Sequence, residues 1–254
     1  IMSIHDQENI IKQVATGLIT NCSENVKELI FVIDGCSDLT DVYLTEVLRD
    51  TNNNIETKFI YTPDIWEVRA NNVGFENSTC PWIVTIQDDM MITEKNFDVR
   101  MLKPFSVVEN LLGVSARNAQ DQTVVDGRLI CYNVFGKDVN SPRDTFGIRD
   151  VIVRGPIMFN HQKLEQCGFL DEDFAPLEAD DKKLSYDAYK RFGFLTGAYV
   201  IGYDSPESWG LTRSNAKSNS IWVQSLHKNE KLLIERHSGL LMGAKHDQNI
   251  EIPE

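Results

Sequence analysis

Three clusters of acidic residues stand out in the sequence, because each lies where a predicted strand ends or a predicted helix begins. They are Asp34-Gly35-Cys36-Ser37-Asp38, Gln87-Asp88-Asp89-Met90 and Glu178-Ala179-Asp180-Asp181. Carboxylates in such places can bind a hard divalent cation or accept a proton from a substrate. They can also cap a helix or complement its dipole, and this structural role is the competing interpretation of the first and third clusters.

The second cluster gives the clearest indication of a metal site. Asp88 and Asp89 are neighbours at the end of a strongly apolar run. Two adjacent negative charges repel each other, and a divalent cation would relieve that cost. Mg²⁺ or Mn²⁺ with few protein ligands, completed by phosphate oxygens and water, fits two carboxylates. A solvated acidic turn is the competing interpretation.

The apolar pattern predicts the elements that must position these clusters. Over residues 1–90, helical and strand periodicities alternate. We expect strands at 1–4, 29–33, 58–61 and 82–86, and helices at 9–18, 39–48 and 68–75. Alternating strands and helices form a doubly wound parallel α/β sheet with helices on both faces, and ligands bind at the carboxyl ends of its strands.

The second half of the chain has a less regular pattern. We expect strands at 113–116, 129–132, 151–159 and 199–203, helices at 161–166 and 180–191, and a polar segment at 214–237 that becomes helical. No linker rich in Pro, Gly or Ser divides the chain. We therefore interpret residues 1–254 as one domain.

Composition limits the partners and the location. The 254 residues include 25 Lys and Arg against 38 Asp and Glu, a net charge of −13, so we expect no nucleic acid partner. An anionic small molecule would need a local cation. Five scattered cysteines without CxxC spacing favour a reducing, cytoplasmic location, whereas the glycosylation sequons at Asn21 and Asn77 are compatible with a secretory lumen. No run approaches the roughly 20 apolar residues of a membrane span, so we expect no membrane anchor within this chain, which starts at Ile1 and reads as a piece of a longer protein.

Six short motifs follow one another in a recognisable order. They are His5-Asp6-Gln7-Glu8-Asn9-Ile10, Ile33-Asp34-Gly35-Cys36-Ser37-Asp38, Arg69-Ala70-Asn71-Asn72-Val73-Gly74, Gln87-Asp88-Asp89, Cys167-Gly168-Phe169-Leu170-Asp171-Glu172-Asp173-Phe174 and Asp180-Asp181. In these motifs the chain resembles the family 2 glycosyltransferases of the GT-A fold, over residues 4–194. The resemblance implies a single domain with a Rossmann-like, doubly wound mixed sheet. It has a nucleotide-sugar-binding half at 1–100, an acceptor-side half at 101–203 and a C-terminal extension at 204–254.

The resemblance assigns nucleotide binding to four residues. Asp34 would hydrogen-bond the base, and Ser3 and His5 would line the base pocket, with His5 in place of a stacking aromatic side chain. Arg69 would contact the nucleotide or its phosphates.

The resemblance also implies a metal site and a general base. Asp88 would lie near the ribose and the metal, and Asp89 would be the more direct metal ligand. Asp181 would remove the proton from the acceptor hydroxyl. A slip in the register of this helix would make Asp180 or Glu178 the base instead.

Further residues are expected to contact the acceptor or the phosphates. They are Asp180, Arg154, Gly155, Trp209 and Arg213. For Trp209 and Arg213, a role in a surface loop competes with this assignment.

The implied activity is transfer of a hexosyl or pentosyl group from a UDP-, GDP- or dTDP-sugar to a hydroxyl of a glycan or glycoconjugate, with Mn²⁺ or Mg²⁺. In-line attack assisted by one carboxylate inverts the anomeric centre without a covalent nucleophile. The alternative is a non-catalytic GT-A-like domain that binds nucleotide-sugar or glycan, since Gln87 replaces an acidic residue of the family's metal motif and Asp180 replaces the Glu of its Glu-Asp pair. A sugar nucleotidyltransferase would need a Gly-rich loop, which His5-Asp6-Gln7-Glu8 is not.

Overall fold

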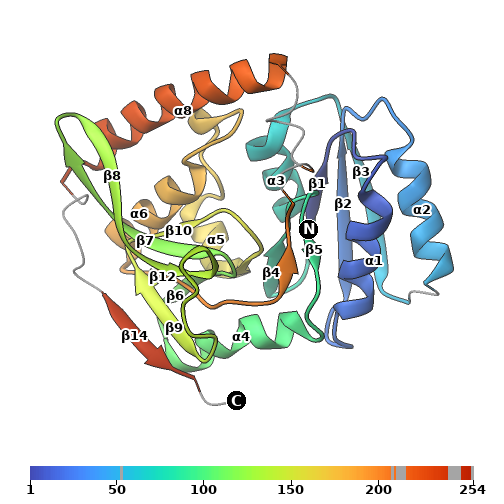
Figure 1. Cartoon of the computed structure of the whole chain (residues 1–254), viewed down its shortest axis with the longest axis horizontal. Coiled ribbons are helices and arrows are strands. Elements are labelled where there is room, and N and C mark those ends of the chain that lie inside the picture. Colours follow the sequence, from blue (N-terminus) through green and yellow to red (C-terminus); the bar gives the residue numbers. More distant parts are fainter. Residues whose placement is uncertain (52–53, 207–208, 210–215, 240–246, 253–254) are drawn as a thin grey trace.

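The first half of the chain folds as strands and helices that alternate around a parallel sheet (Figure 1). The computed structural model describes residues 1–51, 54–206, 209, 216–239 and 247–252. The sheet has the order β1-β2-β3 and pairs in parallel throughout. Its elements are β1 (Met2–Ile4), α1 (Ile11–Asn21), β2 (Glu28–Asp34), α2 (Thr40–Asp50), β3 (Glu56–Thr62) and α3 (Trp66–Glu76).

Strand β2 is buried on both faces, and its alternating side chains separate two layers of helices. Phe31 and Ile33 belong to the apolar cluster that includes Val14 of α1 and Leu44 of α2. Val32 packs instead in a cluster with Ala70 of α3. Because successive side chains of a strand point to opposite faces, this continuous apolar run fixes helices on both sides of the sheet.

A second, mixed sheet continues from the first. The backbone N–H of Ile86 donates to the carbonyl of Ile1 at 2.9 Å, and the amino group of Ile1 donates to the carbonyl of Val84 at 2.7 Å. These bonds set the end of β4 beside the start of β1. The sheet has the order β14-β9-β12-β6-β11-β4. Its strands are β14 (Gln248–Glu251), β9 (Thr145–Arg149), β12 (Leu195–Ala198), β6 (Leu111–Ser115), β11 (Ile157–Asn160) and β4 (Trp82–Thr85).

Helices cover both faces of the mixed sheet. Leu112 of β6 packs in a cluster with residues of α3, α5 (His161–Cys167) and α6 (Asp180–Phe192). Its neighbour Leu111 points to the other face and belongs to a different cluster, and Phe105 of α4 (Phe97–Val107) packs against that cluster. Figure 1 places α5 and α6 on the side of the sheet away from α4.

The remaining strands form two small antiparallel sheets. One has the order β10-β7-β8 and the other pairs β13 with β5. Their strands are β10 (Val151–Val153), β7 (Asn118–Val125), β8 (Arg128–Gly136), β13 (Tyr203–Asp204) and β5 (Met91–Ile92). The short helical turns are η1 (Lys137–Val139) and η2 (Glu172–Phe174), and helix α8 spans Ala216–His237. Within the described residues, no helix combines the length and the apolarity that crossing a membrane requires.

Two sequence-based expectations about strands were wrong. The run 151–159 is not one strand, because Arg154-Gly155-Pro156 separates β10 from β11. Proline lacks an N–H donor and interrupts strand pairing. Residues 199–202 are not a strand either, since the pairing in this region ends at Ala198 of β12 and resumes at Tyr203 of β13.

Candidate active site

One pocket of about 270 Å³ lies where the two sheets meet, at the carboxyl ends of β1 and β4. It brings together most of the site residues predicted from the sequence. These are Ser3, His5, Asp34, Asp88, Asp89, Arg154, Gly155, Asp180 and Asp181. The position agrees with the rule that open α/β sheets bind ligands at strand ends.

Asp34 stands at the end of β2 and is buried, with 4% of its surface exposed. Its carboxylate accepts three hydrogen bonds of 2.7 Å, from the hydroxyl of Thr62 and from the backbone N–H groups of Ile65 and Trp66. In this structure the carboxylate therefore orders the turn between β3 and α3. That turn includes Asp64 and forms part of the pocket wall.

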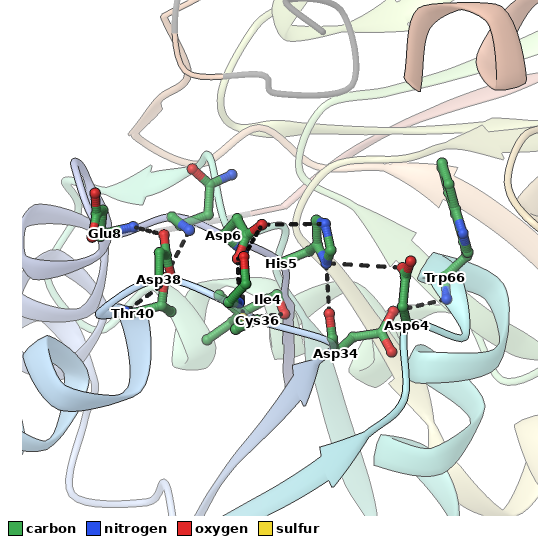
Figure 2. Close-up of polar contacts among 12 residues, drawn as sticks. Ile4, His5, Asp6, Glu8, Asp34, Cys36, Asp38, Thr40, Asp64 and Trp66 are labelled. Carbon is green, nitrogen blue, oxygen red and sulfur yellow. Dashed lines mark hydrogen bonds and ion pairs between the residues drawn. The ribbon is translucent and has the colours of Figure 1, made fainter. Parts of the chain in front are cut away.

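His5 lines the pocket, and its half-exposed ring lies between the carboxylates of Asp6 and Asp64 (Figure 2). Its Nδ1 donates to the carbonyl oxygen of Asp34 at 2.6 Å, so the other ring nitrogen, Nε2, takes no part in this hydrogen bond. Burial lowers the pKa of His5, but the hydrogen bond to Asp34 and the charges of Asp6 and Asp64 outweigh burial, so the pKa is raised. His5 therefore carries positive charge more readily than an isolated histidine.

Asp88 and Asp89 follow β4, and both line the pocket. Asp88 accepts a hydrogen bond from the backbone N–H of His5 at 3.0 Å. Burial, followed by the charge of Asp89, raises the pKa of Asp88 to about 7 despite that bond. Adjacent carboxylate oxygens under mutual repulsion are the donor set that Mg²⁺ or Mn²⁺ takes up, so these two residues fit the metal expected from the sequence.

Arg154 enters the pocket from the break between β10 and β11. Its guanidinium forms ion pairs with Glu67 and Asp180 and is largely buried. Burial lowers the pKa of Arg154, but Asp180 and Glu67 outweigh burial and raise it. Burial raises the pKa of Glu67 to about 7 and that of Asp180 to about 6, although Arg154 opposes both shifts.

The pocket is strongly acidic. Its lining includes seven carboxylates: Asp34, Asp64, Glu67, Asp88, Asp89, Asp180 and Asp181. Among the described residues that line it, the basic side chains are Arg154 and His5. Arg154 is already shared between two carboxylates. A diphosphate in this pocket would therefore need an added cation.

Asp181 is held by uncharged donors, unlike Asp180. Its two carboxylate oxygens accept from the backbone N–H groups of Arg154 and Lys182, each at 2.7 Å. Asp181 is buried, with 5% of its surface exposed, and it lines the pocket. The first bond ties the start of α6 directly to the break after β10.

Gly155 is placed where a side chain does not fit. A Cβ at this position would lie 2.7 Å from the Cβ of Arg117. The lack of a side chain lets the segment after Arg154 pass close to the turn between β6 and β7.

Four predicted site residues are not found in the pocket. Three of them do not belong to its lining, and the fourth lies outside the residues that the structure describes. Arg69 is not part of the pocket lining: its guanidinium pairs with Glu172 at 3.0 Å and is half exposed, and its contact with a nucleotide stays a prediction. Glu67, Ala70 and Asn71 occupy the pocket-facing side of α3, and Arg69 falls off that face.

Glu178 and Trp209 also lie away from the pocket lining. The carboxylate of Glu178 accepts from the indole N–H of Trp222 at 2.7 Å, so it faces α8. Trp209 packs, partly buried, against the apolar cluster of the first half. Arg213 falls outside the described residues.

Several pocket residues were missed in the sequence. Besides Glu67, the lining includes Gln7, Trp66 and Asn71. The side-chain carbonyl of Asn71 accepts from the hydroxyl of Ser3 at 2.8 Å, which joins α3 to β1. The spacing of Glu67, Ala70 and Asn71 is that of one helix face, and this signal could have identified them.

A further acidic group lies beside the pocket. Asp6, Cys36 and Asp38 bring potential ligand atoms within 4.8 Å of one another. Figure 2 shows their contacts with the surrounding loops. Asp6 accepts from the N–H of Ser37 at 2.7 Å, and Asp38 accepts from the N–H of Glu8 at 2.9 Å. These bonds tie the loop after β1 to the start of α2, a structural role.

No protein-family model matches the chain, and no curated protein sequence matches it either. Solved structures do. GalNAc-T7 with UDP, GalNAc and Mn²⁺ matches with a TM-score of 0.61 at 9% identity, over 79% of this chain and 43% of that one. Glucosyl-3-phosphoglycerate synthase from Mycobacterium tuberculosis, in complex with Mg²⁺ and UDP, matches with a TM-score of 0.56 at 14% identity, over 89% of this chain and 77% of that one. Mannosyltransferase PcManGT from Pyrobaculum calidifontis, in complex with GDP-Man and Mn²⁺, matches with a TM-score of 0.56 at 14% identity, over 78% and 53%.

These likenesses show the fold. The chain has the single-domain α/β architecture of the GT-A glycosyltransferases, which confirms the predicted fold class. It spans less than half the length of the first of these structures and about half that of the third. Membership of family 2 stays a prediction.

Proposed function

We propose that this chain is a metal-dependent, inverting glycosyltransferase that moves a hexosyl or pentosyl group from a nucleotide-diphospho-sugar to a hydroxyl of a glycan or glycoconjugate. One observation carries the proposal. A single acidic pocket joins Asp88 and Asp89 of the first half to Asp181 of the second. Transfer from a nucleotide-sugar needs a cation at the diphosphate and a base at the acceptor, and these residues supply a place for each.

The structural neighbours support the choice of donor. Their structures hold UDP or GDP-mannose together with Mn²⁺ or Mg²⁺. In this chain, Asp88 and Asp89 would hold the divalent cation, which when bound would stabilise the charge that develops on the leaving diphosphate. UDP-, GDP- and dTDP-sugars are the donors to test.

The nucleoside end of the donor would lie against the first half of the chain. Ser3 and His5 at the end of β1, and Asp34 at the end of β2, line that part of the pocket. The raised pKa of His5 favours contact with an electron-rich base or a ribose hydroxyl, since its Nε2 would then donate a hydrogen bond.

Asp181 is our choice of general base. Its partners are backbone N–H groups, which orient the carboxylate without neutralising it. Asp180 is instead bound to Arg154, and Glu178 faces Trp222. A base must reach the acceptor hydroxyl as a free carboxylate, and of these three residues Asp181 meets that condition best.

The proposal is tested by incubating the protein with UDP-, GDP- and dTDP-sugars and Mn²⁺. We expect transfer or slow donor hydrolysis with one of them. Asp181→Asn keeps the size of the side chain but removes the base, so turnover should fall about 100- to 10,000-fold while donor binding persists. Binding of a nucleotide-sugar without turnover by the unaltered protein would contradict the catalytic proposal and favour the non-catalytic binding domain.

A further inference from the structure

Helix α8 lies across α6, from the β7–β8 hairpin toward α3 (Figure 1). It docks through one row of buried side chains. Ser225, Asn229, Leu233 and His237 recur every four residues and are at most 4% exposed. A spacing of four keeps side chains on one face of a helix, so this row is the contact face of α8. The row begins and ends on polar residues, and Asn229 lies in its middle.

Asn229 is fully buried, and its side-chain amide is directed at the segment that precedes α6. The two N–H groups of the amide are shared among the carbonyl oxygens of Phe174, Leu177 and Glu178, at N···O distances of 2.6, 2.9 and 2.9 Å. One side chain of α8 thus collects three backbone carbonyls from a stretch of five residues. An amide donor in a buried site is costly to lose, because the carbonyls would then be left without their partner.

The segment held by Asn229 is a turn that its own residues do not favour. Glu178 has φ of 81° and Ala179 has φ of 64°, and both carry a Cβ that opposes the left-handed region. Ala179 also stands at the N-cap of α6, where it offers no side-chain bond to the helix. Asp180 and Asp181 follow at once. Their direction into the pocket therefore depends on a turn that needs support from elsewhere.

Three further contacts attach α8 to this segment and to the residues just before it. The indole N–H of Trp222 donates to Glu178 at 2.7 Å. The ammonium of Lys228 donates to the carbonyl of Asp173 at 2.9 Å. Arg236 pairs with Asp171 at 2.9 Å. Contacts spread over four turns of α8 therefore hold the backbone from 171 to 178.

We propose that α8 positions the acid pair of the active site, and that Asn229 is the positioning residue at its centre. Asn229 does not line the pocket; it acts through the turn at 174–179 on Asp180 and Asp181. The catalytic consequence rests on the proposed function, whereas the control of the turn does not. The inference gives a role to α8, whereas in the C-terminal extension the sequence indicated roles only for Trp209 and Arg213.

The test compares Asn229→Ala with Gln224→Ala in the full chain. Gln224 is a matched control, because its amide is exposed and contacts Ser220 of the same helix. Hydrogen exchange of the peptide covering 174–183 is measured together with thermal stability, binding of UDP and GDP with Mn²⁺, and donor turnover. We expect Asn229→Ala to raise exchange in that peptide about tenfold while the peptides of β1, β2 and β4 stay unchanged.

The kinetic outcome should separate positioning from general loss of fold. Misplacing a catalytic group by about 1 Å lowers turnover about 100-fold, so kcat should fall by that order in Asn229→Ala. The KM for the donor should stay within about twofold, because the nucleotide contacts lie in the other half. Equal losses of kcat and of nucleotide binding would overturn the proposal.

The exchange measurement stands apart from the proposed function. If no donor is turned over by the unaltered protein, the glycosyltransferase proposal fails, while faster exchange of 174–183 in Asn229→Ala still supports the role of α8. Unchanged exchange overturns that role whatever the activity.

If Asn229→Ala does not fold, Trp222→Phe removes the bond to Glu178 but keeps an aromatic ring. It is expected to raise exchange in the same peptide, and unchanged exchange there would again overturn the proposal.

Discussion

The two halves of the chain build the pocket by different means. In the first half, Asp34 and Asp88 follow the ends of regular strands, and their carboxylates accept bonds from uncharged donors such as the N–H groups of Trp66 and His5. In the second half, Arg154 comes from a broken strand and Asp180 from a strained turn, and the two are joined by an ion pair. The sheet therefore places one set of acids by its topology, while buried charges and α8 hold the other set.

This difference predicts where the molecule is vulnerable. Removing one charge of a buried ion pair leaves its partner charged and unpaired in the protein interior, which lowers the stability of the fold far more than removing an exposed charge. Positions in the first half depend on many backbone bonds, so single substitutions there should have smaller effects.

Arg154→Met should destabilise the fold by about 3 kcal/mol at neutral pH, because Glu67 and Asp180 would be left as unpaired buried carboxylates. The loss should shrink as the pH falls from about 8 toward 6. Burial raises the pKa of both carboxyls even with Arg154 present, so without its opposing charge they would take up protons at a still higher pH, which removes the buried charge. Chemical denaturation at pH 8 and pH 6 measures this. Arg49→Met, at an exposed ion pair, is the control; an equal loss in both variants would refute the distinction.

Glu28→Gln tests a buried carboxylate of the first half. Burial raises the pKa of Glu28, but bonds from Thr79 and then Lys58 outweigh burial and lower it to about 2. Stability from this group should be complete above the ordinary pKa of 4.5 and be lost as the pH falls toward 2. We expect a cost of about 1–2 kcal/mol at pH 7 that disappears in acid, after allowance for solvent screening. Glu46→Gln, in a surface ion pair with Lys12, is the control and should lower stability less. If the stability difference between Glu28→Gln and the unaltered protein does not depend on pH, the pKa of Glu28 is not lowered in the folded state.

The halves also differ in how far the sequence predicts them. The run at 29–33 could be interpreted as a buried strand, since its apolar side chains are continuous, and Asp34 at its end then belonged to the site. Arg154 could not be placed in the same way. The apolar residues on both sides of Arg154-Gly155-Pro156 suggest one strand, and only Pro156 indicated the break that turns the guanidinium into the pocket.

Two features of the site exceed what a single sequence shows. The orientation of α3 decides that Asn71, and not Arg69, faces the pocket, and this depends on packing against β1 and β2. The left-handed turn at Glu178 and Ala179 has no signal in the residue types, since neither is Gly, Asn or Asp. Tertiary contacts with α8 stabilise it, and such contacts lie far apart along the chain.

Arg69→Ala should have the smallest effect. Its ion pair with Glu172 is exposed on both sides, and such pairs contribute less than about 0.5 kcal/mol. Affinity for a nucleoside diphosphate with Mn²⁺ should change by less than about twofold, because Arg69 lies outside the pocket lining. Calorimetric titration measures this. A loss of about tenfold or more would restore Arg69 to the nucleotide site and contradict the placement of α3.

A metal and nucleotide site in this pocket is tested by a thermal-shift measurement of the unaltered protein and Asp89→Ala with UDP or GDP, each with and without Mn²⁺. If the first half holds a metal and a nucleoside diphosphate, the unaltered protein should be stabilised by about 2–3 kcal/mol at a ligand concentration of about 100 times Kd, and only when Mn²⁺ is present. Asp89→Ala should lose that stabilisation while keeping its own fold. Equal stabilisation of both proteins, or none of the unaltered protein by any of the nucleotides, would contradict a nucleotide-sugar site in this pocket.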